Sequence, residues 1–452
     1  MAVLPKNSGY IQTSDPKMPR SDAAVPFRNI IPSPDHPRIA GIQDHTALSW
    51  CESRRQIEAP AWLINRLEAK NLERPYRGFT SDGNVREGLY NYTEDEGAPT
   101  EEVIAKTEEL LKILSQEQRK AVQFEDVTDD EFRLGSNPEL YMNPGGLRLD
   151  ECSPEIQTAI HAILKASSSK QGYEKIHACC LTNDFLGHLV NGKKVLNEHS
   201  YNFRLFGTPS MRKPWGYTFF GHHLSHVVVF LGKRMVIGPT FMGAEPDRID
   251  EGPHAGLRLF RSEEMDSLSL MQSLSRELQD KATLSKGMDG KSLPDDRWNP
   301  FDERHLGGAR QDNRIVPYEG CPVSEFPADK QELIIKLFKS FNEYYPDAVL
   351  EQRVALFKKH LGETYFAWIG EFGDNDPYYY RIHSPVAFME LDFHCGIFLT
   401  NTSPARCHIH TCNRLPNRGD YGRALLEQYT ENHLSINQNY LQPYKILRPR
   451  IP

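Results

Sequence analysis

The chain has 452 residues, of which 39% are hydrophobic and 25% are charged, and its formal net charge is -8. These values are typical of a globular protein with a large core, and the acidic balance disfavours nucleic acid and anionic membranes as partners. There is no run of about 18 apolar residues, and the first residues lack the apolar segment of a secretory signal, so we expect a cytoplasmic protein without a membrane span. The eight cysteines include no C-x-x-C pair, and we expect reduced thiols.

Residues 1–99 are predicted to form an extended arm and loops. Pro, Ser and Asp are frequent in "SDPKMPRSD" and "NIIPSPDHPRIAG", and this composition favours irregular structure over helices or strands. An arm of this length could join two subunits, so a homodimer is one expectation. We expect residues 100–452 to form a single domain.

Several segments of this domain show the spacing of apolar residues that is typical of helices. The first covers residues 100–124, with glutamates in its first turn. Its apolar stripe consists of Val103, Ile104, Leu110, Leu111 and Leu114. Further helices are expected from Ser153–Pro154 onward, over 262–283 with Ser262 as the N-cap, and over 328–344, 346–360 and 421–434.

Aromatic and β-branched runs between glycines and prolines predict strands over residues 199–241, with "LGKR" as a hairpin turn. Three later segments, "TYFAWIGEF", "YYYRIHSPVAFMELDFH" and "ARCHIHTCNR", are also strand candidates. We find no regular alternation of strands and helices and no internal repeat. The predicted fold is therefore α+β, with a mostly antiparallel sheet that carries a histidine cluster and is surrounded by helices.

Two strand-like segments concentrate histidines. They are "WGYTFFGHHLSHVVVF", with His222, His223 and His226, and "CHIHTCNR", with His408 and His410. Residues i and i+2 of a strand share a face, so His408 and His410 are expected to point to the same side. If the two strands are neighbours, the imidazoles converge, and neutral imidazole is a ligand for zinc, iron, copper, manganese and nickel.

A single histidine is more often a surface or hydrogen-bonded core residue than a metal ligand. Two clusters in β-like sequence favour the metal, and we expect a divalent ion on four of them. The expected ligands are His222, His223, His408 and His410. Zinc is favoured because an all-histidine set needs no redox chemistry, and iron, manganese and copper are alternatives. His226 is the least certain candidate, and a structural role is the alternative for it.

Charged residues near the two histidine segments could complete the site. Glu390, in the apolar context "AFMELDF", is expected to be buried and to move protons, or else to form an ion pair with Arg381 or Arg414. Arg414 could bind a substrate carboxylate through its planar guanidinium. Glu245 is expected to be a turn carboxylate, and Asp420 to be the N-cap of the last helix.

Several stretches, taken in order, resemble the family known as domain of unknown function 3500. They are "FGTPS", "WGYTFFGHH", "PTFMGAEP", "QDNRIVPYEG", "YYRIHSP", "FMEL" and "HIHTCNRLPNRGDYG", and the resemblance covers residues from about 100 to about 435. The family pattern contains Gly-His-His, His-x-His, an Arg and Asp-Tyr-Gly. The resemblance implies that these places are filled by His222, His223, His408, His410, Arg414 and Asp420, and it does not require His226.

The sequence lacks the G-x-S-x-G, P-loop and G-x-G-x-x-G motifs, which disfavours serine hydrolases, P-loop proteins and dinucleotide-binding enzymes. The leading expectation is a metal-dependent enzyme that acts on a small organic molecule by hydrolysis, elimination or cyclisation, with Glu390 and Arg414 as catalytic residues. One alternative is an oxygen-using iron, copper or manganese enzyme on the same histidines. A second is a protein that binds a metal or ligand without catalysis.

Overall fold

The computed structural model describes residues 26–55, 57, 61, 76–133, 145–299, 301–308 and 311–434. The first 25 residues of the expected arm lie outside these ranges. The helices of the described residues are α1 Ala47–Arg54, α4 Thr100–Ile113, α5 Gln116–Val122, α6 Pro154–Ser167, α7 Lys170–Leu189, α8 Arg261–Ser273, α9 Arg276–Ala282, α10 Ala328–Phe341, α11 Asp347–Lys359 and α12 Arg423–Leu434. Within the described residues, no helix has both the length and the apolar character needed to cross a bilayer.

The strands of the described residues form one sheet of twelve, in the order β1-β3-β4-β5-β6-β12-β11-β10-β9-β7, with β2 beside β3 and β8 beside β9. They are β1 Gln123–Phe124, β2 Leu147–Arg148, β3 Tyr201–Phe206, β4 Trp215–Gly221, β5 Leu224–Leu231, β6 Arg234–Ala244, β7 Thr283–Ser285, β8 Cys321–Pro322, β9 Tyr365–Gly370, β10 Tyr378–His383, β11 Phe388–Phe393 and β12 Ile409–Arg414. Pairing is antiparallel except for β1 with β3 and β7 with β9. The α+β prediction with a mostly antiparallel sheet is confirmed.

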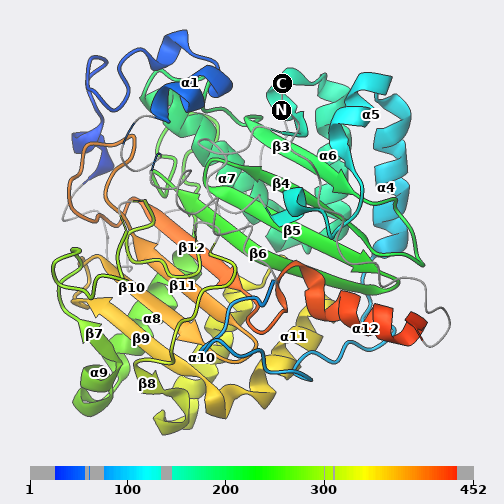
Figure 1. Cartoon of the computed structure of the whole chain (residues 1–452). Coiled ribbons are helices and arrows are strands. Elements are labelled where there is room, and N and C mark those ends of the chain that lie inside the picture. The colour runs from blue at the N-terminus through cyan, green and yellow to red at the C-terminus, as the bar shows by residue number, and fades with distance from the viewer. Residues whose placement is uncertain are drawn as a thin grey trace.

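The order of elements in the first half of the fold is repeated in the second. Helices α4 to α7 and strands β1 and β2 precede the meander β3–β6, and α8 to α11 with β7 and β8 precede the meander β9–β12. In each half, a short parallel strand and a short antiparallel strand pair with the first strand of the meander. The meanders join through β6 and β12, in the middle of the sheet (Figure 1). The expectation of no internal repeat is thus corrected by the order and pairing of these elements.

The two faces of the sheet have different coverings, because alternate residues of a strand point to opposite sides. On one side Met389, Leu391 and Ile409 belong to the main hydrophobic core, together with residues of α6, α7, α8 and α10. In Figure 1 the helices α8 and α10 lie behind β9–β12. The other side carries Asp392 and His410, and its covering comes largely from loops.

Serine N-caps divide two of the predicted helices. The segment 100–124 forms α4 and α5, because Ser115 caps α5 by accepting a hydrogen bond from the Gln118 amide. The segment 262–283 divides in the same way at Ser275, into α8 and α9. Ser262 is not the N-cap of α8, which begins at Arg261 after Phe260 in a left-handed conformation. Helix α7, the longest helix among the described residues, was not predicted.

Hairpins explain where the observed strands differ from the predicted ones. The segment "YYYRIHSPVAFMELDFH" forms two strands, β10 and β11, that turn at Ser384–Pro385. The predicted turn at "LGKR" is confirmed, with Leu231 paired to Arg234. His222 and His223 do not lie in a strand, because they are the two residues that connect β4 to β5.

The described part of the predicted arm packs against the body of the fold. Residues Ile39, Ile42 and Trp50 form a second hydrophobic cluster with Leu186 and Phe398. Phe398 belongs to the loop between β11 and β12, so this part of the arm supports the loop that leads into the histidine segment. The homodimer expected through the arm stays a prediction.

Candidate metal centre

Three of the predicted ligands meet on the loop-covered face, at the centre of the sheet. His408 immediately precedes β12 and His410 lies in it, while His223 comes from the β4–β5 turn. Their Nε2 atoms are 3.0 Å apart for His408 and His410, 3.1 Å for His410 and His223, and 3.3 Å for His408 and His223. All three residues are buried. Segments nearly two hundred residues apart in the sequence thus form one cluster.

Backbone conformation brings the third ring into the cluster. His223 has a φ of 62°, in the left-handed region where non-glycine residues are uncommon. Such a conformation costs free energy, and it is typically kept where a site requires it. Because His223 lies in the turn, its side chain does not follow the alternation of side chains along a strand, and its ring points toward His408 and His410.

Gly243 leaves the space that the rings occupy. This residue of β6 pairs with His410 across the sheet. A Cβ atom at this position would lie 2.9 Å from Cδ2 of His410 and 3.0 Å from Cδ2 of His223. A side chain here would therefore push the imidazoles apart, so the histidine cluster depends on this glycine.

Three neutral imidazoles cannot satisfy this arrangement with hydrogen bonds alone. Each Nε2 either carries a proton or presents a lone pair, so at least two of the three are in the same state and at least one contact is repulsive. Burial lowers the pKa of all three histidines, and repulsion from neighbouring imidazoles lowers it further, so the rings are neutral near pH 7. A cation between them would accept all three lone pairs.

The spacing of the nitrogens suits a first-row metal ion. Bonds of about 2.0–2.1 Å in tetrahedral geometry place two ligand nitrogens about 3.3–3.4 Å apart, close to the observed separations. His408 also has the outer contact that metal-binding histidines usually make, because its Nδ1 lies 2.6 Å from the carbonyl oxygen of Cys395. A proton on Nδ1 donates to this carbonyl and leaves the lone pair of Nε2 for the ion. His223, His408 and His410 could thus hold a metal ion.

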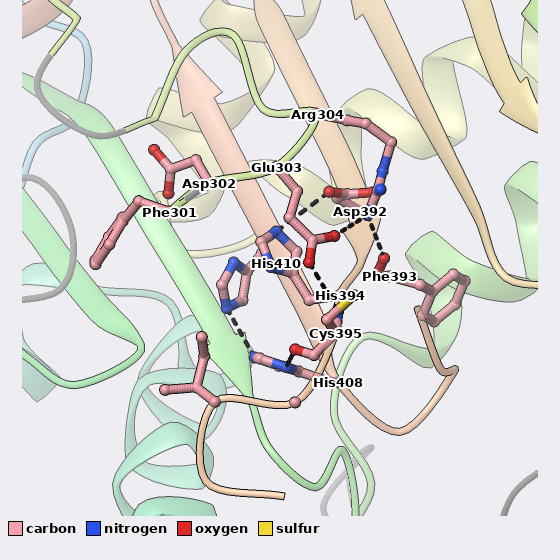
Figure 2. A network of polar contacts seen from close by, with 12 residues as sticks. Phe301, Asp302, Glu303, Arg304, Asp392, Phe393, His394, Cys395, His408 and His410 are labelled. Atoms are coloured by element: carbon pink, nitrogen blue, oxygen red, sulfur yellow. Dashed lines mark hydrogen bonds and ion pairs between the residues drawn. The ribbon is translucent and has the colours of Figure 1, made fainter. Parts of the chain in front are cut away.

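Four further residues near the three histidines were not predicted as ligands. They are Glu303, His305, Asp392 and His394, all buried. The ring centroids of His394 and His410 are 3.9 Å apart, and Asp392 is the residue opposite His410 in the β11–β12 pairing. Ligand atoms of His305, His394 and His410 form one group that could hold an ion, and those of Glu303, Asp392 and His394 form another. Figure 2 shows His410 between His408 and the carboxylates.

Glu390, the predicted proton-transfer residue, lies on the same face but its oxygens are occupied. The amides of Leu306 and Gly307 each donate to it at 2.8 Å, the hydroxyl of Tyr379 donates to it, and Nδ1 of His305 lies 3.4 Å away. Burial alone would raise the pKa of Glu390, but these donors hold it below its ordinary value. Glu390 is therefore a charged group that fixes the loop carrying His305.

Arg414 lies at the opposite end of β12 from His410, and its guanidinium is fully engaged with the protein. Its Nε donates to Asp420 at 2.6 Å, one Nη to the carbonyl of Gly307 at 2.7 Å, and the other Nη to Asp312 at 2.9 Å. Asp420 does not cap the last helix, because its carboxylate binds Arg414 and the Leu415 amide. The structure therefore places Arg414 in a buried ion-pair network.

Glu245 organises the loop before the His408 segment. Its carboxylate accepts hydrogen bonds from the amides of Ile397, Phe398 and Leu399. One carboxylate oxygen also lies 3.9 Å from Nδ1 of His408. Its predicted role as a turn carboxylate is close to what the structure shows, although the turn belongs to a distant part of the chain.

His222 and His226 lie outside the close groups of ligand atoms. Nδ1 of His222 is 2.9 Å from Oδ1 of Asn183, and its ring stacks on that of His223 with centroids 3.9 Å apart. His222 therefore supports His223 from behind. His226 lies on the helix-covered side, with its ring edge against Tyr344 at 5.6 Å.

The site is thus a buried candidate metal centre of three histidines, at the central strands of the twelve-stranded sheet that the described residues form. Residues 96–423 match the family model described as "Protein of unknown function (DUF3500)". This match covers more than half of the chain, so the protein belongs to that family. The comparison with curated proteins gives no match, and neither does the comparison with solved structures.

Proposed function

We propose that this protein is a metal-dependent enzyme that acts on a small organic molecule. A divalent ion would bind to Nε2 of His223, His408 and His410. The observation that carries the proposal is the convergence of these three buried nitrogens to within 3.0–3.3 Å of one another. Three neutral rings hold that geometry at a cost unless a cation lies between them.

The number of close nitrogens favours a catalytic ion over a structural one. A structural zinc is usually closed by four protein ligands, while a catalytic zinc has three and keeps a position for water or substrate. The bound ion would polarise a carbonyl group or lower the pKa of a water molecule. Zinc and redox-neutral chemistry, such as hydrolysis, elimination or cyclisation, are the favoured combination.

An oxygen-using enzyme is the second candidate. The specific observation in its favour is that the close set is purely imidazole, because imidazole also suits copper and iron. The metal found in purified protein, together with the activity measured with and without oxygen, separates the two candidates. Activity that requires oxygen would exclude the redox-neutral proposal.

The test of the metal site compares two histidine variants by elemental analysis. His408→Ala removes a ligand and its contact with the Cys395 carbonyl, so it is expected to lose one ion per chain relative to the wild type while remaining folded. His226→Ala is the matched control, because His226 is also fully buried but lies on the other side of the sheet. Equal metal content in wild type and His408→Ala would contradict the proposal.

A further inference from the structure

A second group of buried ligand atoms lies beside the three-histidine site. It consists of Glu303, Asp392 and His394, whose ligand atoms all lie within 4.8 Å of one another. We infer that these three residues form a second cation position, next to the ion on His223, His408 and His410. This inference goes beyond the proposed function and does not depend on it, since the two positions have different ligands.

The bonding capacity of the second group is only partly used within the described residues. Asp392 and His394 are both fully buried, and Nδ1 of His394 has no hydrogen bond from the described residues, while Oδ2 of Asp392 and Nε2 of His394 have only each other. Oδ2 of Asp392 lies 3.2 Å from Nε2 of His394, and Oε1 of Glu303 lies 3.9 Å from Nδ1. A buried polar atom without a full set of hydrogen bonds is costly, so this arrangement favours a ligand at the group.

Arg304 holds the two carboxylates in position from the outside. Its Nε donates to Oδ1 of Asp392 at 2.7 Å, and one Nη donates to Oε2 of Glu303 and, at 2.7 Å, to the carbonyl of Phe393. This arrangement leaves Oδ2 of Asp392 directed at His394 (Figure 2). Carboxylates that bind metal ions are usually fixed in this way by outer hydrogen bonds. Two carboxylates and one guanidinium also leave one negative charge, which a divalent cation would more than neutralise.

The backbone conformation of Glu303 supports a role for this residue in a ligand site. This residue has a φ of 49°, which is uncommon for a side chain other than glycine. Its Oε1 accepts a hydrogen bond from the Cys395 amide at 3.1 Å, and the carbonyl of Cys395 receives the Nδ1 contact of His408. One peptide segment thus connects the second group to the three-histidine site, and the strained residue presents its carboxylate to both His394 and that segment.

The ligand types indicate which cation the second position would take. Two carboxylates and one imidazole form a harder set than three imidazoles, which suits manganese or zinc better than copper. Two adjacent divalent ions could share one water or substrate oxygen, as in two-metal enzymes. This last step rests on the proposed function: the substrate would then carry an oxygen that both ions can bind, such as a carbonyl or carboxylate group.

The experiment counts ions per chain after purified protein is loaded with zinc or with manganese and dialysed. The wild type is expected to hold two, while Asp392→Asn and His394→Ala are expected to hold one. His394→Ala keeps both ion pairs of Arg304, so it tests the inference even if Asp392→Asn does not fold. His226→Ala is the control and is expected to hold two.

The variants also separate this inference from the proposed function. His408→Ala is expected to keep the ion of the second position, while His394→Ala keeps that of the first. One ion per chain in the wild type, with the same content in His394→Ala, would overturn the second position and leave the first intact. Unchanged content in His408→Ala with a loss in His394→Ala would overturn the first and support the second.

Discussion

The buried polar groups at the two ends of strand β12 differ in whether the protein itself satisfies their hydrogen bonds. At its C-terminal end, the described donors of Arg414 meet Asp420, Asp312 and the Gly307 carbonyl at 2.6–2.9 Å. At its N-terminal end, His410 faces other imidazoles, and its Nδ1 has no hydrogen bond from the described residues. Both ends lie on the loop-covered face and both are almost completely buried.

The difference separates a structural network from a candidate ligand site. A buried polar group that finds all its partners within the protein fixes the fold, while one that lacks them leaves capacity for something from outside. Arg414, Asp312 and Asp420 thus join β12 to the chain segments beside it. The histidine end has the geometry of a site that is complete only with a cation.

The largest expected effect on stability comes from breaking the network at Arg414. Arg414→Ala leaves Asp420 as a buried carboxylate without its guanidinium, while Asp312 keeps Arg133, and this should lower the free energy of unfolding by about 3–5 kcal/mol. Arg418→Ala is the control, because its ion pair with Glu427 is partly exposed and should cost less than about 1 kcal/mol. Chemical denaturation measures both. A stable Arg414→Ala protein that binds metal but has lost activity would restore the predicted role of Arg414 in substrate binding.

A methyl group at residue 243 should weaken metal binding at the histidine end of β12. Gly243→Ala places a Cβ 2.9–3.0 Å from two of the rings, so metal affinity is expected to fall on the order of 10- to 100-fold. Gly362→Ala is the control, since a Cβ there meets nothing within 4 Å. Titration of metal-free protein with zinc gives the two affinities. Unchanged affinity in Gly243→Ala would show that the ion does not lie between these rings.

Protonation of His226 should destabilise the protein in acid. Burial lowers its pKa from 6.5 to about 3 in the folded protein, so between these values the unfolded chain binds more protons than the folded one. Stability therefore falls as the pH decreases below 6.5, by about 2 kcal/mol from this residue at pH 5. His226→Leu should remove this part of the pH dependence, while the exposed His188→Leu should not. If the free energy of unfolding changed with pH in the same way for the wild type and His226→Leu, this would contradict a neutral, buried His226.

The smallest effect is expected at His222. His222→Leu removes the ring behind His223 and the contact with Asn183, but none of the three close nitrogens. Metal should still bind in the same amount, with affinity reduced about tenfold, as for the loss of an outer contact. Complete loss of the ion, as in His408→Ala, would instead make His222 a ligand, as the sequence had predicted.

The periodicity of the sequence was sufficient for the fold class and for most of the elements. Apolar spacing located α4, α6, α10 and α11, and the i, i+2 rule placed His408 and His410 on one side. Ser115 and Ser275 carried the signal for helix breaks within two predicted helices, because serine at an N-cap followed by Glu or Gln starts a new helix.

The rest of the site depends on tertiary structure. Glu303 and His305 lie in a loop without strand or helix periodicity, and they reach the sheet only because Glu390 and Arg304 fix that loop. The left-handed conformation of His223 follows from a two-residue turn that the aromatic run concealed. His394 follows β11 directly, and its i, i+2 relation to Asp392 was the one available signal for the second group.

Anomalous X-ray diffraction from crystals of purified protein tests the central claim most directly. The account predicts a metal peak bonded to Nε2 of His223, His408 and His410, at about 2.0–2.1 Å from each if the ion is zinc. An absorption edge scan of the same crystals identifies the element. The three rings in contact with no peak between them, in protein loaded with zinc, copper, iron or manganese, would contradict the account.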